Sequence, residues 1–166
     1  FLAGQHNQSW FYDAPLSEKG IKQALELQNF LRQDPALLTP KQQKLVQLML
    51  TTSQLVSSNL RRAIATMAIG FSDRLLRQTD SKIVILPHLQ EISRNPDALS
   101  VTPAHATAVE LAWTDPKFLK DIYSEQMDTS LHTGNKPLKT NGLLRMMDFC
   151  NVIFSNKTLS ASECLV

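Results

Sequence analysis

The run KIVIL at residues 82–86 constrains the fold of this chain more than any other feature. It is short, rich in β-branched residues and stopped by Pro87, which is typical of a parallel strand that is buried on both faces. A second strand is predicted near residues 54–57, and a helical pattern over residues 59–78 separates the two. The order strand, helix, strand predicts an α/β fold with a mostly parallel central sheet flanked by helices.

The remaining segments are predicted to be helices joined by polar loops. Ser17 is a good N-cap for a helix whose apolar stripe ends near residues 34–35, and Pro40 suits the first position of the next helix. Further helices are predicted over residues 103–113, 116–123 and 141–154, loops over 1–16, 88–102 and 124–140, and a last strand from residue 161.

The composition is that of one ordinary globular domain, which we expect to span residues 1–166. The net charge is +2 and the longest basic block is Arg61-Arg62, so the sequence does not predict a nucleic-acid-binding protein. A membrane-spanning helix needs about 20 apolar residues, and no apolar run approaches that length. We therefore expect neither nucleic acid nor a membrane as a partner.

The cysteines and histidines predict neither a disulfide framework nor a metal centre. Cys150 lies in a helical apolar pattern and Cys164 in a strand-like run, so both are expected to be buried free thiols. Free thiols favour a reducing compartment, and we expect a cytoplasmic protein. The spacing of metal ligands and the glycine motifs of nucleotide-binding folds are absent, so we expect no metal and no cofactor.

The segment SNLRRA at residues 58–63 is a candidate anion site, because two arginines open the helix that follows the strand at residues 54–57. An anion there would meet unpaired helix N–H groups, the positive end of the helix dipole and a guanidinium fork. The alternative is a solvated first turn. Ligands of parallel sheets bind beyond the carboxyl ends of the strands, so Arg62 and Glu91 are expected to converge from two strand ends.

Three sequence blocks resemble those of the histidine phosphatase superfamily, in the same order. They are DAPLSEKGIKQA at residues 13–24, SNLRRAIAT at 58–66 and PHLQE at 87–91, and GQHN at 4–7 is similar to a segment of eukaryotic phosphatase members. The resemblance implies a phosphoglycerate mutase-like fold, a three-layer α/β sandwich with a mostly parallel central sheet flanked by helices. It also implies hydrolysis of a small phosphorylated substrate through a phosphohistidine intermediate, without a metal.

The resemblance assigns roles to individual residues. Arg62 would clamp the phosphate, Glu91 would protonate the leaving alkoxide, Asn7 would contact the phosphate and His6 could line the pocket. As alternatives, Asn7 is a plain turn residue, and Glu91 is a loop carboxylate paired with Arg94.

Other positions have no catalytic role in the resemblance. Arg61 occupies a variable position and is expected to be exposed, and His88 is expected at the rim of the site. His105 is predicted to lie in a helix and His132 in an irregular loop, where each is solvated or structural.

Both histidine motifs of the superfamily are absent from these 166 residues, and the position of the nucleophile falls on Phe1. We therefore expect a histidine-phosphatase-like domain that is truncated at both ends and that does not itself turn over p-nitrophenyl phosphate. Two alternatives stay open. One is a catalytically inactive relative that acts as a binding or scaffold domain, and the other is a structural subunit of a larger assembly.

Overall fold

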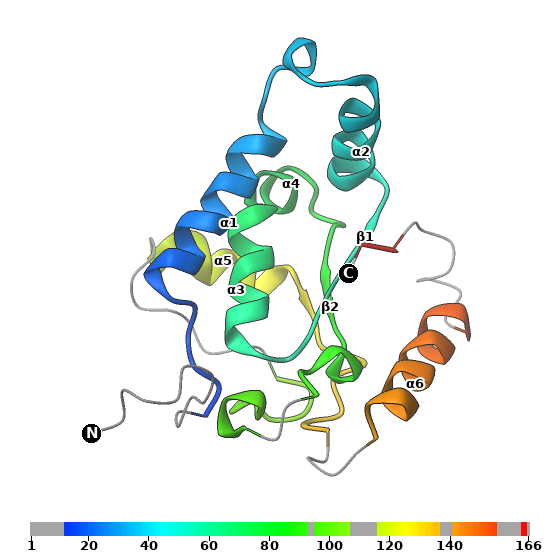
Figure 1. Cartoon of the computed structure of the whole chain (residues 1–166). Coiled ribbons are helices and arrows are strands. Elements are labelled where there is room, and N and C mark those ends of the chain that lie inside the picture. Colours follow the sequence, from blue (N-terminus) through cyan, green and yellow to red (C-terminus); the bar gives the residue numbers. More distant parts are fainter. Residues whose placement is uncertain (1–11, 93–94, 107–115, 137–140, 156–163, 166) are drawn as a thin grey trace, which may run out of the picture.

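The computed structural model describes residues 12–92, 95–106, 116–136, 141–155 and 164–165 (Figure 1). Within these residues, four parallel strands form one sheet in the order β3-β2-β1-β4. The predicted α/β class and the parallel sheet are confirmed. The strands are β1 (Gln54–Ser57), β2 (Ile83–Ile85), β3 (Met127–Asp128) and β4 (Cys164–Leu165).

The helices occupy most of the segments in which the sequence predicts them, and short 3₁₀ turns mark several loops. The helices are α1 (Glu18–Leu31), α2 (Pro40–Thr51), α3 (Arg61–Gly70), α4 (Ser72–Arg77), α5 (Pro116–Glu125) and α6 (Gly142–Ser155), and the 3₁₀ turns are η1 (Pro35–Leu37), η2 (Pro87–Leu89) and η3 (Pro96–Ala98).

Two helix starts follow directly from the local sequence. The Ser17 hydroxyl accepts a hydrogen bond from Gly20 N at 3.2 Å, which satisfies one of the free N–H groups of α1. At α2, Thr39 and Gln42 form a capping box, and Pro40 occupies the first turn as predicted.

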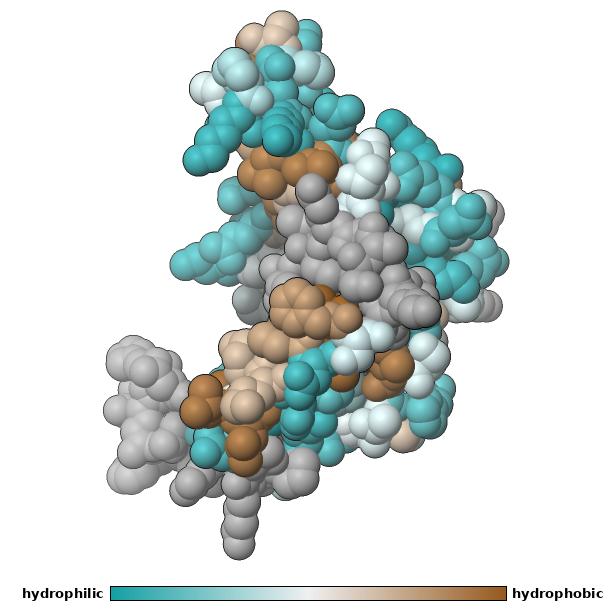
Figure 2. Space-filling view, turned by 90° about the vertical axis from the view of Figure 1, so that its right-hand side faces the viewer, coloured by the Kyte–Doolittle hydropathy of each residue, from teal (hydrophilic) through white to brown (hydrophobic). Residues whose placement is uncertain are grey.

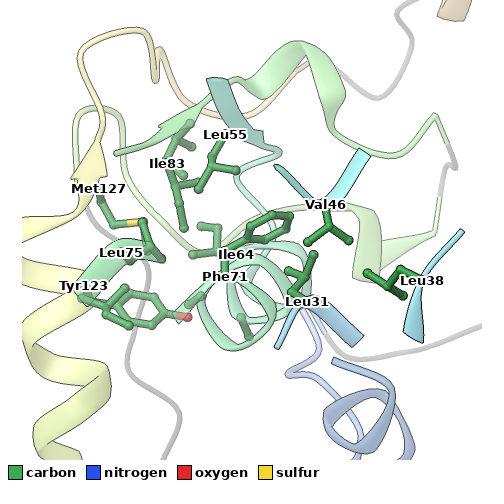
Figure 3. Close-up of a cluster of buried hydrophobic side chains, with 14 residues drawn as sticks. Leu31, Leu38, Val46, Leu55, Ile64, Phe71, Leu75, Ile83, Tyr123 and Met127 are labelled. Atoms are coloured by element: carbon green, nitrogen blue, oxygen red, sulfur yellow. The ribbon is translucent and has the colours of Figure 1, made fainter. Parts of the chain in front are cut away.

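Different helices cover the two faces of the sheet. Neighbouring residues of a strand point to opposite faces, so Leu55 and Val56 of β1 belong to separate apolar clusters. Leu55 joins the larger cluster, to which α1 to α5 contribute side chains (Figure 3). Val56 joins the smaller one, against which Phe149 and Val152 of α6 pack. Burying a leucine or isoleucine fully stabilises a fold by about 1.5–3 kcal/mol, so these clusters fix the layers on both sides of the sheet.

Three predicted elements are wrong in part. The helix predicted over residues 59–78 is two helices, because Phe71 leaves the helical conformation (φ −107°, ψ 17°). The helix predicted from Pro103 does not form over residues 103–106, where His105 has a positive φ of 56°, and residues 107–113 lie outside the described part. The segment predicted to be irregular over residues 124–140 contains the edge strand β3.

Two side-chain environments bear on predictions from the sequence. His132 is fully buried, and burial together with nearby His105 lowers its pKa, so the structural alternative applies and the solvated one is wrong. Cys150 is a free thiol but only partly buried, because α6 leaves much of its surface exposed. The side chain of Cys164 lies outside the described part of the chain. No helix among the described residues has the length and apolarity to cross a membrane.

Candidate functional site

The candidate site lies at the edge of the sheet where β1 and β2 end. The two strands are parallel and in register, with Ser57 opposite Ile85, and Leu86 N donates to Ser57 O at 2.8 Å. The chain continues from β1 into the first turn of α3 and from β2 into η2. Both connections therefore emerge at one edge, which is where parallel sheets bind ligands.

Arg62 and Glu91 meet at this edge, as the sequence predicts. Arg62 Nη2 donates to Glu91 Oε2 at 2.6 Å, and Arg62 Nη1 donates to the Asp97 carbonyl at 2.9 Å. The Arg62 side chain is 26% exposed and that of Glu91 is 47% exposed. The guanidinium is thus held in place by two elements while the carboxylate stays open to solvent. A ligand can reach both groups.

The N-terminus of α3 already holds an anion of the protein itself. The Asp13 carboxylate is completely buried; its Oδ1 accepts from Arg61 N at 2.7 Å, and its Oδ2 accepts from Val101 N at 3.0 Å and from the Ser100 hydroxyl at 3.2 Å. A negative charge at this point complements the helix dipole. The expectation that an external anion would meet unpaired N–H groups here is therefore wrong for Arg61 N, and the Arg62 side chain remains the group that is open to a ligand.

Arg61 also differs from its prediction. Its side chain is only 21% exposed, and its Nε donates to the Asp13 carbonyl at 2.8 Å. It joins the segment before α1 to the start of α3. Arg61 therefore has a structural role at the site, which its neighbour in sequence, Arg62, does not share.

The loop that carries Glu91 is fixed by a buried amide. Gln90 is almost fully buried; its Nε2 donates to Asn135 Oδ1 at 2.8 Å, and its Oε1 accepts from Lys136 N at 2.9 Å. Asn135 in turn accepts from Ser100 N at 2.7 Å. These bonds join the segments around residues 90, 100 and 135. Gln90 therefore holds the backbone of the adjacent Glu91 in place.

Other predicted residues are placed less completely. Asn7, His6 and Arg94 lie outside the described part of the chain, so neither the phosphate contact of Asn7 nor an Arg94–Glu91 pair is tested. His88 is half-buried at the start of the Glu91 loop, and burial lowers its pKa, with nearby Lys136 contributing. In the described ranges, no group of three or more histidine, cysteine, aspartate or glutamate side chains could hold a metal ion.

Sequence reasoning assigned no role to Asp13, although it stands first in the first block of the resemblance. Its contacts bring that block against Arg61 of the second block, and the pair of Arg62 with Glu91 brings the second block against the third. The three blocks therefore lie together at one edge of the sheet. The place of Asp13 at the head of the first block, before the turn-forming Ala14-Pro15, was the signal that could have indicated this role.

The arrangement can bind an oxyanion and transfer a proton. A guanidinium that is held in place offers two parallel N–H donors to phosphate or carboxylate oxygens, and an adjacent carboxyl group can donate to an oxygen of the bound ligand. Comparisons of the chain with protein-family models, with curated proteins and with solved structures find no match.

Proposed function

We propose that the edge formed by Arg62 and Glu91 binds the phosphoryl group of a small phosphomonoester, and that the full-length protein hydrolyses it. The ion pair of 2.6 Å between these two side chains, at the carboxyl ends of neighbouring parallel strands, supports this proposal. The finer phosphoglycerate mutase-like topology, with Asn7 and His6 as further substrate contacts, belongs to the same proposal.

The chemistry assigns separate tasks to the two side chains. Arg62 would bind the equatorial oxygens of the phosphoryl group and stabilise the charge that they carry in the transition state. When the bond between phosphorus and the ester oxygen breaks, Glu91 would give its proton to that leaving oxygen.

The attacking group is a histidine according to the resemblance, and the bond to it would form as the ester bond breaks. In the resemblance, however, the position of this histidine falls on Phe1. This observation favours a second candidate function, a domain that binds a phosphorylated ligand without hydrolysing it. Turnover distinguishes the two functions, since both require the phosphate site.

The substitution Glu91→Gln tests the proposal, because it should change binding and turnover in opposite directions. At pH 8 we expect it to strengthen the affinity of this chain for inorganic phosphate by about three- to tenfold, since the carboxylate that competes for Arg62 is gone. In the full-length enzyme the same change should lower kcat by about 100-fold, because the proton donor is lost.

Isothermal titration calorimetry measures the binding, and release of phosphate from a phosphomonoester measures the turnover. Glu26→Gln is the matched control, because Glu26 is exposed on α1 away from the site. The absence of phosphate binding, or an equal response to both substitutions, would contradict the proposal. Tighter phosphate binding by Glu91→Gln, with no hydrolysis by the wild-type full-length protein, would favour the binding domain.

A further inference from the structure

A cavity of about 310 Å³ lies beside the Glu91 loop, between η2 and the first turns of α6. The helix begins close to this loop, and a Cβ at Gly142 would come within 2.8 Å of Ile92 Cδ1. The cavity wall is largely apolar but contains three ionisable groups. Its principal lining residues are His88, Glu91, Ile92, Arg145, Met146 and Phe149.

Arg145 is the unusual member of this wall. Arg145 is only 5% exposed, and its Nε and Nη2 atoms are buried and have no hydrogen-bond partner among the residues that the structure describes. Nη1 makes one long bond of 3.3 Å to the Glu91 carbonyl. Among the described residues no carboxylate forms an ion pair with Arg145, and burial lowers its pKa. A buried cation without a counter-ion is costly, so a retained one calls for an explanation.

Arg74 shows how this fold binds a buried arginine whose role is structural, although its Nε, like that of Arg145, has no hydrogen-bond partner among the described residues. Its two Nη atoms donate to Met49 O at 2.7 Å, to Ser53 Oγ at 3.0 Å and to Ser53 O at 2.6 Å. Three protein oxygens therefore surround that guanidinium. Arg145 is about as buried as Arg74, but its guanidinium makes one long hydrogen bond within the described ranges, and it lines an apolar cavity beside the proposed phosphate site.

Glu91 connects the two places. Its carboxylate pairs with Arg62, its carbonyl accepts from Arg145, and it lines the cavity. A leaving group protonated by Glu91 would therefore start next to this cavity.

We propose that the cavity binds the organic part of the substrate, and that this part is an apolar group, such as an aromatic ring, carrying a second anionic group that pairs with Arg145. This inference rests on the proposed function for the phosphoryl end of the ligand. The apolar wall supplied by Ile92, Met146 and Phe149 accounts for the apolar group, and the unpaired guanidinium accounts for the second anion.

Three non-hydrolysable phosphonates separate these contributions. They are methylphosphonate, phenylphosphonate and 4-phosphonobenzoate, titrated calorimetrically into this chain at pH 8. We expect phenylphosphonate to bind about tenfold more tightly than methylphosphonate, because the ring leaves water for an apolar wall. We expect the added carboxylate to strengthen binding by about fivefold or more through a charge-assisted hydrogen bond.

Two substitutions test whether these increases in affinity come from contacts in the cavity. Arg145→Met should remove the gain due to the carboxylate, and the variant should fold, since it replaces a buried unpaired charge by an apolar side chain. Met146→Ala should reduce the gain due to the ring. Their matched controls are Arg77→Met, on an exposed arginine of α4, and Met147→Ala, on a methionine as exposed as Met146 that does not line the cavity. Both controls should bind all three phosphonates like the wild type.

The outcomes separate the two proposals. If methylphosphonate does not bind, the phosphate site itself is refuted. If the three phosphonates bind equally well, or if both cavity variants behave like their controls, the phosphate site stands and the cavity is not the site of the organic group. The inference is supported if Met146→Ala reduces the increase in affinity due to the ring and Arg145→Met removes the increase due to the carboxylate, while the two controls bind like the wild type.

Discussion

Replacing Arg62 with alanine is expected to abolish phosphate binding by this chain and to lower the turnover that we propose for the full-length protein by about 100- to 1000-fold, the usual cost of losing a preorganised oxyanion donor. Arg62 is the guanidinium at the edge of the sheet whose Nη2 faces an open carboxylate. Arg62→Lys should retain part of the binding, because it keeps the charge but loses the planar fork.

The loss should not come from unfolding. Glu91 is 47% exposed, and an exposed ion pair contributes little to stability, so Arg62→Ala should stay folded, with an unfolding midpoint lowered only by the loss of the hydrogen bond to the Asp97 carbonyl, about 1 kcal/mol. Arg77→Ala is the control for a general loss of positive charge, because Arg77 is exposed on α4. Phosphate affinity in Arg62→Ala equal to that in Arg77→Ala would refute the assignment of Arg62.

Asp13→Ala is expected to have the largest effect on stability, about 3–5 kcal/mol in the free energy of unfolding. The carboxylate is fully buried and accepts from Arg61 N, Val101 N and the Ser100 hydroxyl. Removing it leaves these donors without their partner and leaves the first turn of α3 without its anionic cap. Since domains are stable by about 5–15 kcal/mol in total, the variant should lose a large share of its stability.

Urea unfolding followed by circular dichroism measures this effect. Asp80→Ala is the matched control, because Asp80 is exposed in the turn after α4, and it should change the free energy by less than about 0.5 kcal/mol. Asp13→Asn, which keeps an acceptor but loses the charge, should fall between the two. Equal unfolding midpoints for Asp13→Ala and Asp80→Ala would show that the buried Asp13 carboxylate does not stabilise the fold.

The sequence predicts the part of the site that depends on short-range patterns. The strands predicted near residues 54–57 and 82–86 form as β1 and β2, and their carboxyl ends bring Arg62 and Glu91 to the same edge. This step needs only the rule that parallel strands end together. The capped starts of α1 and α2 are likewise local, because the residues that form each cap lie within three positions of each other.

The features that escaped prediction depend on contacts between distant segments. Asp13 binds an N–H group 48 positions away, which no local pattern indicates. The strand β3 has two residues, too few for a period, and forms because it extends the sheet beside β2. At Phe71 the apolar spacing continues although the helix breaks, so periodicity alone could not place the boundary.

The packing of α6 is the clearest example of a feature that the sequence does not predict. The sequence of α6 is amphipathic, yet the charged Arg145 is buried, whereas the apolar residues Leu143, Leu144 and Met147 are exposed. Figure 2 shows that apolar side chains lie on this face of the molecule. A hydrophobic pattern predicts which residues share a face of a helix. It does not predict which of those faces packs against the sheet. Nor does it indicate the cavity at one end of α6 that buries the Arg145 cation.

The location of a bound tungstate ion, a heavy-atom analogue of phosphate, tests the central claim most directly. Crystals of the chain grown or soaked with tungstate would show the metal by its anomalous scattering. We expect one ordered tungsten position at the carboxyl edge of β1 and β2, with an oxygen within hydrogen-bond distance of the Arg62 guanidinium and another near the Glu91 carboxyl. Tungstate bound elsewhere on the protein, with the Arg62–Glu91 ion pair intact and unoccupied, would contradict the account.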